Sequence, residues 1–210
     1  MKGRFTMGYD STYYTDFDVR LNYDLNRFVN LTILFSAQVD ADKLFEVILR
    51  EAMMIGNCDA GTLYLLEDHS LKFKYLITKS QNVAINSKDA AAFPPVPLQE
   101  TYASAYSAIK KTRLNIPDVY KDRKFDFNGS MKYDSMNGYH TGSMLVVPMA
   151  VGGDDTVGVI QLINAMDSRG KMRNGLGIHY AFTQEQEKLV MALGSVSALY
   201  IENRKLKGLM

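Results

Sequence analysis

The most apolar stretch of the chain divides into two strand-like segments, Met144 to Val151 and Thr156 to Ile163. Between them stands Gly152-Gly153-Asp154-Asp155, which has the composition of a tight turn, so the pattern predicts a β-hairpin. Nearly every position in both segments is apolar, which predicts central strands that are covered on both faces. Because Pro148 has no N–H group to donate, we expect a bulge or a late start of the neighbouring strand beside it.

Two helices are predicted before any strand. From Arg20 to Ser36, apolar residues recur at spacings of three and four, which is the pattern of an amphipathic helix. A second helix is expected to begin after Asp40 as its N-cap and to end at Gly56-Asn57. Residues 1–19 are polar and tyrosine-rich without an apolar period, and we expect a flexible arm.

A second hairpin is predicted from Ala60–Glu67 and Leu71–Thr78, which are separated by Asp68-His69-Ser70. Apolar and polar residues alternate in its second strand, so we expect a half-solvated strand at the edge of the sheet. The following segment, Ser80 to Pro97, is irregular and proline-rich and is predicted to be a surface loop.

A helix is predicted from Leu98 to Thr112, directly after Pro97. Polar residues then dominate from Lys121 to Gly142, with several aromatic residues among them, and a loop of this length is usually functional or disordered. A glycine-rich insertion, Asp167 to Tyr180, is expected to be a flexible loop.

The last predicted helix begins at Thr183, which with Gln186 has the spacing of a capping box. Its apolar stripe has the period of a coiled-coil seam, and Asn203 lies where a polar residue often fixes the register. We expect the stripe to pack on the sheet for about four turns and then to extend beyond the domain, with residues 207–210 still helical before an output domain. The stripe comprises Leu189, Ala192, Val196, Leu199, Asn203, Leu206 and Met210.

Composition sets limits on the function. The chain has 210 residues, 47% of them hydrophobic, which suits one domain, expected over residues 20–206. A net charge of +1, with both signs spread evenly, argues against nucleic acid or an anionic membrane as a partner. The sequence has neither a long apolar run nor a signal-peptide pattern, so a cytoplasmic protein is expected. Cys58 is the only cysteine and is interpreted as a buried thiol, which excludes a multi-cysteine metal site.

Three segments and their order carry a family resemblance. They are Leu114–Tyr120, Gly138–Pro148, and Gly158–Asn164 followed by Phe182-Thr183. In these segments and their order, the chain resembles the GAF domain from about Leu25 to Leu206. The GAF domain is a small-molecule-sensing module of bacterial signalling proteins and cyclic-nucleotide phosphodiesterases. The resemblance implies an α+β sandwich with a six-stranded antiparallel sheet. It places the first, second and last helices on one face, and a ligand pocket on the other.

Cyclic-nucleotide-binding members of the family carry a signature that is only partly present. Asn164, Phe182 and Glu187 match it, but Ala165 replaces its lysine and Gln186 replaces its aspartate. In those members the lysine and aspartate form an ion pair. Both partners are absent together here, so no lone charge is left, and the substitution disfavours cyclic AMP or cyclic GMP as the ligand.

No catalytic or cofactor chemistry is predicted. Bilin-binding members of the family attach the chromophore through a cysteine near a pocket histidine, and Cys58 alone does not fit that arrangement. A haem-binding variant would need a pocket histidine, and His140 is more simply a hydrogen-bonded structural residue. The sequence contains no phosphate loop, nucleophile elbow or paired metal-binding histidines, so we expect neither a metal site nor an enzyme.

The resemblance implies a pocket roofed by Leu98–Thr112 and by Asn115–Tyr139. An alternative is that Phe125 and Tyr139 fill the pocket as core residues and that Asp118 caps the turn after Pro117. The candidate ligand contacts are Tyr120, Phe125, Tyr139 and Thr141, with Asn115, Asp118 and Ser143 as polar contacts.

The predicted function is that of a sensory or regulatory domain in a bacterial signal transduction protein. A homodimer is expected through the terminal helices, with ligand occupancy relayed to an output domain of the kinase, cyclase, phosphodiesterase or phosphatase type. The alternative is a ligand-free dimerisation module whose pocket is filled by its own side chains.

Overall fold

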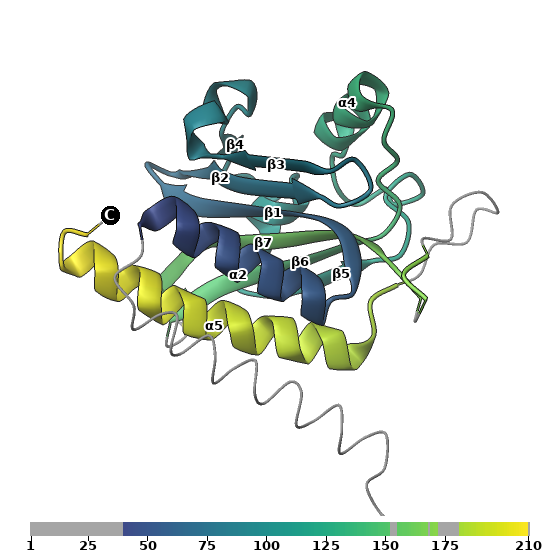
Figure 1. The fold of residues 1–210 in the computed structure, drawn as a ribbon. Helices are drawn as coiled ribbons and strands as arrows, with labels where there is room; N and C mark the ends of the chain where they lie inside the picture. The colour runs from purple at the N-terminus through teal and green to yellow at the C-terminus, as the bar shows by residue number, and fades with distance from the viewer. Residues whose placement is uncertain (1–39, 152–154, 168, 172–180, 210) are drawn as a thin grey trace, which may run out of the picture. The chain divides into compact units, whose positions relative to one another are not determined.

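The computed structural model describes residues 40–151, 155–167, 169–171 and 181–209. Two long helices, α2 (Ala41–Ile55) and α5 (Gln184–Leu206), cover one face of a twisted antiparallel sheet (Figure 1). Two shorter helices, α3 (Ala103–Lys110) and α4 (Asn128–Asn137), belong to the opposite side. The predicted helix at 20–36, the predicted arm at 1–19 and most of the predicted loop at 167–180 lie outside the described residues.

The sheet has the strand order β3-β2-β1-β7-β6-β5, and all its pairs are antiparallel. A seventh short strand, β4, pairs with β2 beside this path. The α+β sandwich with a sheet of six main strands is therefore confirmed. The strands are β1 Cys58–Glu67, β2 Ser70–Thr78, β3 Val83–Asn86, β4 Val96–Pro97, β5 Leu114–Ile116, β6 Met144–Val151 and β7 Asp155–Ala165.

Helix α2 begins and ends where its sequence predicts. The Asp40 carboxylate accepts a 2.8 Å hydrogen bond from the backbone N–H of Lys43, and Gly56 is the C-cap. Its apolar face packs on β1 and on the neighbouring strands, so that Ile48 and Leu49 are fully buried. A Cβ atom on Gly61 would lie 2.9 Å from Leu49, and this close approach explains the glycine in β1.

The first hairpin is confirmed, and its turn residues Asp68 and His69 both have positive φ, as a two-residue hairpin turn requires. The expected edge position of β2 is wrong, because β3 pairs with its outer side. The segment predicted as a surface loop, Ser80 to Pro97, contains β3, the 3₁₀-helix η1 (Ser87–Ala92) and β4. These elements are too short to show a periodic pattern.

The central hairpin of β6 and β7 is confirmed, with β7 between β1 and β6. The register slips between Met149 and Ala150, next to Pro148, as expected from the missing N–H group. Gly158 in β7 lies so close to β1 that a Cβ atom would meet the carbonyl oxygen of Tyr64 at 2.2 Å.

Two helix predictions are corrected on the other face. Helix α3 begins at Ala103 rather than Leu98, because the chain first makes a turn in which the Tyr102 N–H donates to the Gln99 carbonyl. Helix α4 lies inside the predicted loop at Lys121 to Gly142. Its only buried residue is Asp134, so it has no apolar stripe by which the sequence could reveal it.

The capping box of α5 is confirmed: Thr183 and Gln186 exchange side-chain-to-backbone hydrogen bonds of 2.8 and 3.2 Å. The expectation that the first four turns of the stripe pack on the sheet is wrong, because Ala192, Val196 and Leu199 are exposed. Leu206, in the part expected to extend beyond the domain, is also exposed. The predicted continuation of the helix is not found at residues 207–209, since α5 ends at Leu206 and Gly208 has a positive φ, and Met210 lies outside the described residues. The face that α5 buries comprises Val190, Leu193, Gly194, Ser197, Ala198, Ile201 and Arg204.

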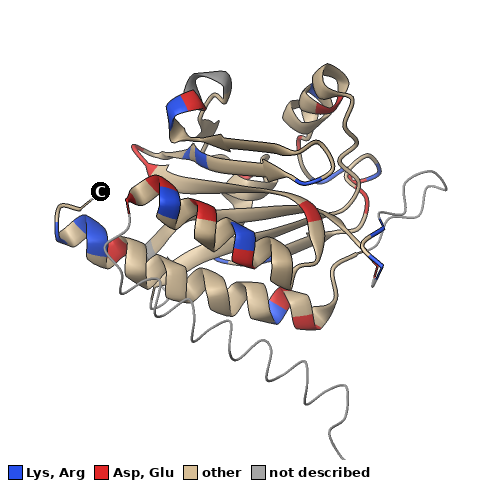
Figure 2. Ribbon diagram, in the orientation of Figure 1, with Lys and Arg blue, Asp and Glu red and all other residues tan. Residues whose placement is uncertain are grey.

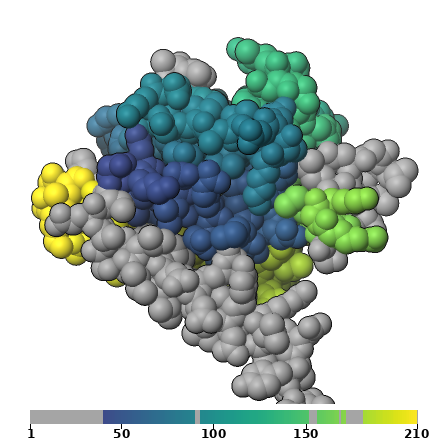
Figure 3. Space-filling model, viewed as in Figure 1, coloured from purple at the N-terminus to yellow at the C-terminus, as the bar shows by residue number. Residues whose placement is uncertain are grey.

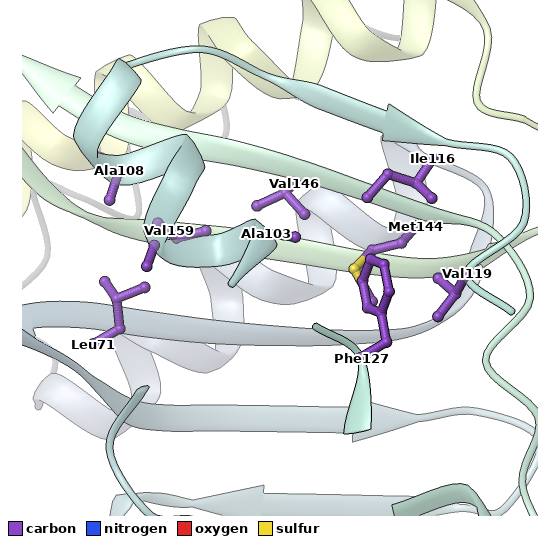
Figure 4. Close-up of a cluster of buried hydrophobic side chains, with 10 residues drawn as sticks. Leu71, Ala103, Ala108, Ile116, Val119, Phe127, Met144, Val146 and Val159 are labelled. Carbon is purple, nitrogen blue, oxygen red and sulfur yellow. The ribbon is translucent and has the colours of Figure 1, made fainter. Parts of the chain in front are cut away.

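Charged residues lie mainly on the helices and loops, and β5 and β6 contain none (Figure 2). The space-filling view shows the α2 side of the molecule, where α4 forms a separate projection (Figure 3). On the opposite face of the sheet, α3 places Ala103 and Ala108 over Val146 and Val159 (Figure 4). Among the described helices, none combines the length and the apolar character needed to cross a membrane.

Candidate functional site

A cavity of about 450 Å³ lies on the face of the sheet opposite α2 and α5. Its floor is formed by side chains of β1, β2, β6 and β7, and its walls by three segments. These are residues 93–97, the start of α3 at 102–104, and residues 126–141 around α4. A volume of this size is within the usual range for small-molecule sites.

The floor of the cavity has a polar centre in an apolar surround. Thr62 of β1 and Gln161 of β7 are directly opposite each other in the sheet, and both line the cavity. Gln161 is only 8% exposed, although it lines the cavity. A carboxamide has both donor and acceptor groups, so this side chain can hydrogen-bond to a ligand in the cavity.

Two helix N-termini open into the cavity. In α3 the first helical hydrogen bond runs from the Tyr106 N–H to the Tyr102 carbonyl at 2.8 Å, and no side chain caps the helix. The preceding N–H groups, including that of buried Ser104, therefore lack helical partners. In α4 the carboxylate of Asp126 accepts from the Asn128 N–H at 2.8 Å, so that terminus already has an anion.

Aromatic side chains form much of the wall. Phe93 stacks on Phe73 with ring centroids 4.3 Å apart, and the ring of Tyr133 is edge-on to Tyr139 at 6.4 Å. Among the described lining residues Asp126 is the only charged one, and none is lysine or arginine. The remaining aromatic lining residues are Tyr64, Tyr102 and Phe127.

A buried network joins the cavity wall to one end of the central strands, where β1 begins and β7 ends. The Tyr139 hydroxyl donates to Asp59 at 2.8 Å and accepts from the Asn164 amide at 3.0 Å. Asp59 also accepts two hydrogen bonds from Ser80, and Asn164 binds Gly142 and His140 through its side chain. Burial and the adjacent Asp59 charge raise the pKa of Tyr139 far above its ordinary value.

A second buried carboxylate holds α4 in place. Asp134 is 4% exposed and accepts hydrogen bonds from the Thr141 N–H at 2.7 Å, the Thr141 hydroxyl at 2.8 Å and the Tyr120 hydroxyl at 2.8 Å. Burial and the bond to Asp134 raise the pKa of Tyr120 to about 12. The Tyr120 ring also stacks on His140 at 4.6 Å, and His140 is not among the described lining residues of the cavity.

Of the seven candidate ligand contacts, the structure places Tyr139 and Thr141 in the cavity lining. Asn115 lies elsewhere and ties β5 to α5, because its amide donates to the Phe182 carbonyl and to Glu187, both at 2.7 Å. Asp118 accepts from the Tyr120 N–H at 3.0 Å, which is the capping role of the alternative interpretation.

The other three candidates also stand outside the described lining. The Ser143 hydroxyl accepts from the Ala165 N–H at 3.1 Å, Tyr120 holds Asp134, and Phe125 contacts Tyr106 edge-on at 5.2 Å. The cavity lining residues that the sequence analysis did not single out include Gln161, Thr62 and Phe127. Gln161 could have been identified from the sequence as a candidate site residue, since it is the one polar side chain in the apolar run Val157 to Ile163.

Cys58 is fully buried, and its burial raises the pKa of the thiol to about 12, so it is unsuited to nucleophilic chemistry. Within the described part of the chain, no three histidine, cysteine, aspartate or glutamate residues are grouped to hold a metal ion. The site therefore consists of hydrogen-bonding groups, aromatic rings and two helix termini.

Comparison with known proteins assigns the family. The sequence pattern of the GAF domain matches residues 40–201. The chain belongs to the GAF domain family. GAF domains are regulatory domains of signalling proteins and of phosphodiesterases.

The chain is similar to a dual 3',5'-cyclic-AMP and -GMP phosphodiesterase 11A of Takifugu rubripes, with 27% identity over 182 residues. This match covers 85% of the chain but only 18% of that relative. Its fold is similar to the GAF domains of two phosphoenolpyruvate-protein phosphotransferases. For the Coxiella burnetii domain the TM-score is 0.66 at 13% identity, with 89% of this chain and 97% of that one covered. For the Acinetobacter domain the TM-score is 0.64 at 12% identity, with 90% of this chain and 99% of that one covered.

Proposed function

We propose that this GAF domain is a sensory or regulatory domain that binds a small molecule in the cavity between the sheet, α3 and α4. The observation that carries the proposal is the cavity of about 450 Å³ with the carboxamide-bearing Gln161, only 8% exposed, on its floor. The uncapped start of α3 at the same cavity adds N–H donors that lack helical partners. Both features suit a ligand with hydrogen-bonding groups.

The alternative of a self-filled pocket has less support. It required Phe125 and Tyr139 to occupy the pocket, but Phe125 is not among the described lining residues. Tyr139 is held at the wall by its bonds to Asp59 and Asn164, and a cavity of about 450 Å³ remains. We therefore favour the ligand-binding function.

Occupancy would be relayed through the helices on the other face. Asn57, which follows α2, binds the carbonyl of Met166 directly after β7 at 3.1 Å, and Gln186 of α5 donates to the Gly56 carbonyl at 2.9 Å. Displacement of the β7 end by a ligand would thus reach the junction of α2 and α5. We propose a kinase, cyclase, phosphodiesterase or phosphatase as output, in a cytoplasmic signal transduction protein.

Homodimerisation through α5 is part of the proposal. Val196, Leu199 and Leu206 are 38%, 59% and 84% exposed along one side of the helix, with Asn203 also exposed. An apolar helical face of this kind suits a second copy of the same helix. Sedimentation of wild type and Leu199→Glu would test it: a dimer that the variant converts to a monomer supports the interface, and a monomeric wild type contradicts it.

Native mass spectrometry of the purified chain tests the ligand proposal. We expect a retained mass of a few hundred daltons per chain in the wild type. Gln161→Leu should lose it, whereas Gln184→Leu, on the exposed first turn of α5, should keep it. If wild type shows no retained molecule, thermal-shift titration with cyclic AMP and cyclic GMP follows, because the phosphodiesterase relative is named for both. No retained mass and no shift would contradict the proposal.

A further inference from the structure

The direction of hydrogen bonding is fixed for two hydroxyl groups of the cavity wall. Tyr139 and Thr141 both line the cavity, and each hydroxyl lies 2.8 Å from a buried aspartate oxygen, of Asp59 and Asp134 respectively. A carboxylate only accepts hydrogen bonds, so each hydroxyl must donate its proton to it. The protons of both hydroxyls therefore point away from a ligand.

Only lone pairs remain available to a ligand at this wall. The Tyr139 oxygen already accepts from Asn164 at 3.0 Å, whereas no described residue donates to the Thr141 hydroxyl. Thr141 is 2% exposed, so its oxygen is a buried acceptor at the cavity. A ligand group that also accepts, such as a carboxylate or phosphate oxygen, would meet lone pairs with no proton between them.

The charges behind the wall have the same sign. Asp59 and Asp134 are 3% and 4% exposed, and their described partners are neutral hydroxyl and backbone N–H groups. Among the described lining residues there is also no basic side chain, and the single charged one is Asp126. Coulomb interactions are strong in such a poorly solvated place, so a donor or a positive charge is favoured there and an anion is disfavoured.

The aromatic lining is compatible with a positive ligand. Tyr102, Phe127 and Tyr133 line the cavity together with Tyr139, and the faces of such rings attract cations. The N–H groups at the start of α3 belong to another wall and would receive an acceptor of the same ligand.

We propose that the wall formed by Tyr139 and Thr141 selects a small molecule that places an ammonium, amino or hydroxyl donor against it and excludes an anionic group from that position. This inference rests on the proposed ligand-binding function and specifies the chemistry of the ligand.

Three probes that share an indole ring and differ in the head group test the inference. They are tryptamine (ammonium), tryptophol (hydroxyl) and indole-3-acetate (carboxylate), each titrated by ligand-observed NMR. We expect tryptamine to bind at least about tenfold more tightly than indole-3-acetate, with tryptophol between them. Thr141→Val should weaken tryptamine by about tenfold, since it removes the acceptor. Thr141→Ser should keep the affinity, and Thr112→Val, at an exposed position after α3, is the matched control.

The outcomes are decisive in both directions. Thermal melting of each variant separates a folding defect from a binding defect, and the serine variant keeps the test informative if the valine variant unfolds. Equal or tighter binding of indole-3-acetate, or unchanged tryptamine binding by a folded Thr141→Val, would overturn the inference. Absence of binding by all three probes would also overturn it, whereas the proposed function is judged separately by the mass retained on the purified chain.

Discussion

The Tyr139 hydroxyl donates a 2.8 Å hydrogen bond to Asp59, which lies 80 positions earlier in the sequence. This bond joins the segment that leads into β6 to the beginning of β1, and the Asn164 amide binds the same hydroxyl from the end of β7. Three strands are thus linked at one edge of the cavity through a single phenol. Because the residue is both a wall of the cavity and a link between strands, its loss should be visible in stability as well as in binding.

Tyr139→Phe should lower the free energy of unfolding by about 1 to 3 kcal/mol, since Asp59 and Asn164 each lose a buried partner. Tyr133→Phe is the matched control, because Tyr133 also lines the cavity and its one described hydrogen bond, from Asn137, is to the backbone carbonyl and not to the hydroxyl. Urea denaturation of both variants provides the comparison. An equal effect of the two substitutions would show that the network contributes nothing specific.

Asp134→Ala should release α4, because Asp134 is the only buried residue of that helix and accepts three hydrogen bonds. Limited trypsinolysis reports this opening, since Lys132 is exposed on α4. We expect cleavage after Lys132 to become at least about tenfold faster, while cleavage after Lys188 of α5 is unchanged. Ser135→Ala is the control, and a parallel rise at both lysines would indicate global unfolding instead.

Cys58 should resist thiol reagents in the folded protein. It is fully buried, and burial raises its pKa to about 12, so the reactive thiolate is scarce at neutral pH. Labelling with a disulfide reagent at pH 8 should proceed only as fast as the protein unfolds, and urea should accelerate it. Rapid stoichiometric labelling without denaturant would contradict the burial of this thiol.

Stability should fall at high pH through partly buried tyrosines such as Tyr64. Burial raises the pKa of Tyr64 from 10.0 to about 12, so its neutral form is favoured in the folded state. This contribution is fully present below pH 10 and is lost as the pH rises toward 12. Melting temperatures of wild type and Tyr64→Phe between pH 8 and 11 test this. The difference between them should change above pH 10, and a constant difference would show that Tyr64 does not contribute.

Gly158→Ala should destabilise the protein by about 2 to 3 kcal/mol, because the new Cβ would overlap the Tyr64 carbonyl across the β1–β7 pair. Gly129→Ala is the counterpart, since no atom lies within 4 Å of its Cβ position in α4. It should be neutral or stabilise by about 0.5 to 1 kcal/mol. Thermal or urea denaturation would measure both, and equal effects would contradict the close strand approach.

Local chemistry made much of the fold predictable. The Asp40 cap, the capping box of Thr183 and Gln186 and both hairpins depend on neighbouring residues, and each is found where the sequence places it. Helix α4 was missed because a buried aspartate, not an apolar stripe, holds it. The α5 stripe was assigned to the wrong face because small and polar residues such as Gly194 and Ser197 pack on the sheet.

The site was less predictable because its polar residues are used in two ways. Asn115, Asp118 and Ser143 complete hydrogen bonds within the protein, and no sequence pattern separates such residues from those available to a ligand. Gln161 was available as a clue, since a polar side chain on a strand covered on both faces needs a partner.

The central claim is that a small molecule occupies this cavity and changes the helices on the opposite face. Hydrogen exchange of the chain as purified, compared with the same chain after unfolding, dialysis and refolding, tests it most directly. We expect slower exchange in the purified sample at residues 93–104 and 126–141, together with a change in the first turn of α5. Identical exchange in the cavity segments of the two samples would contradict the claim.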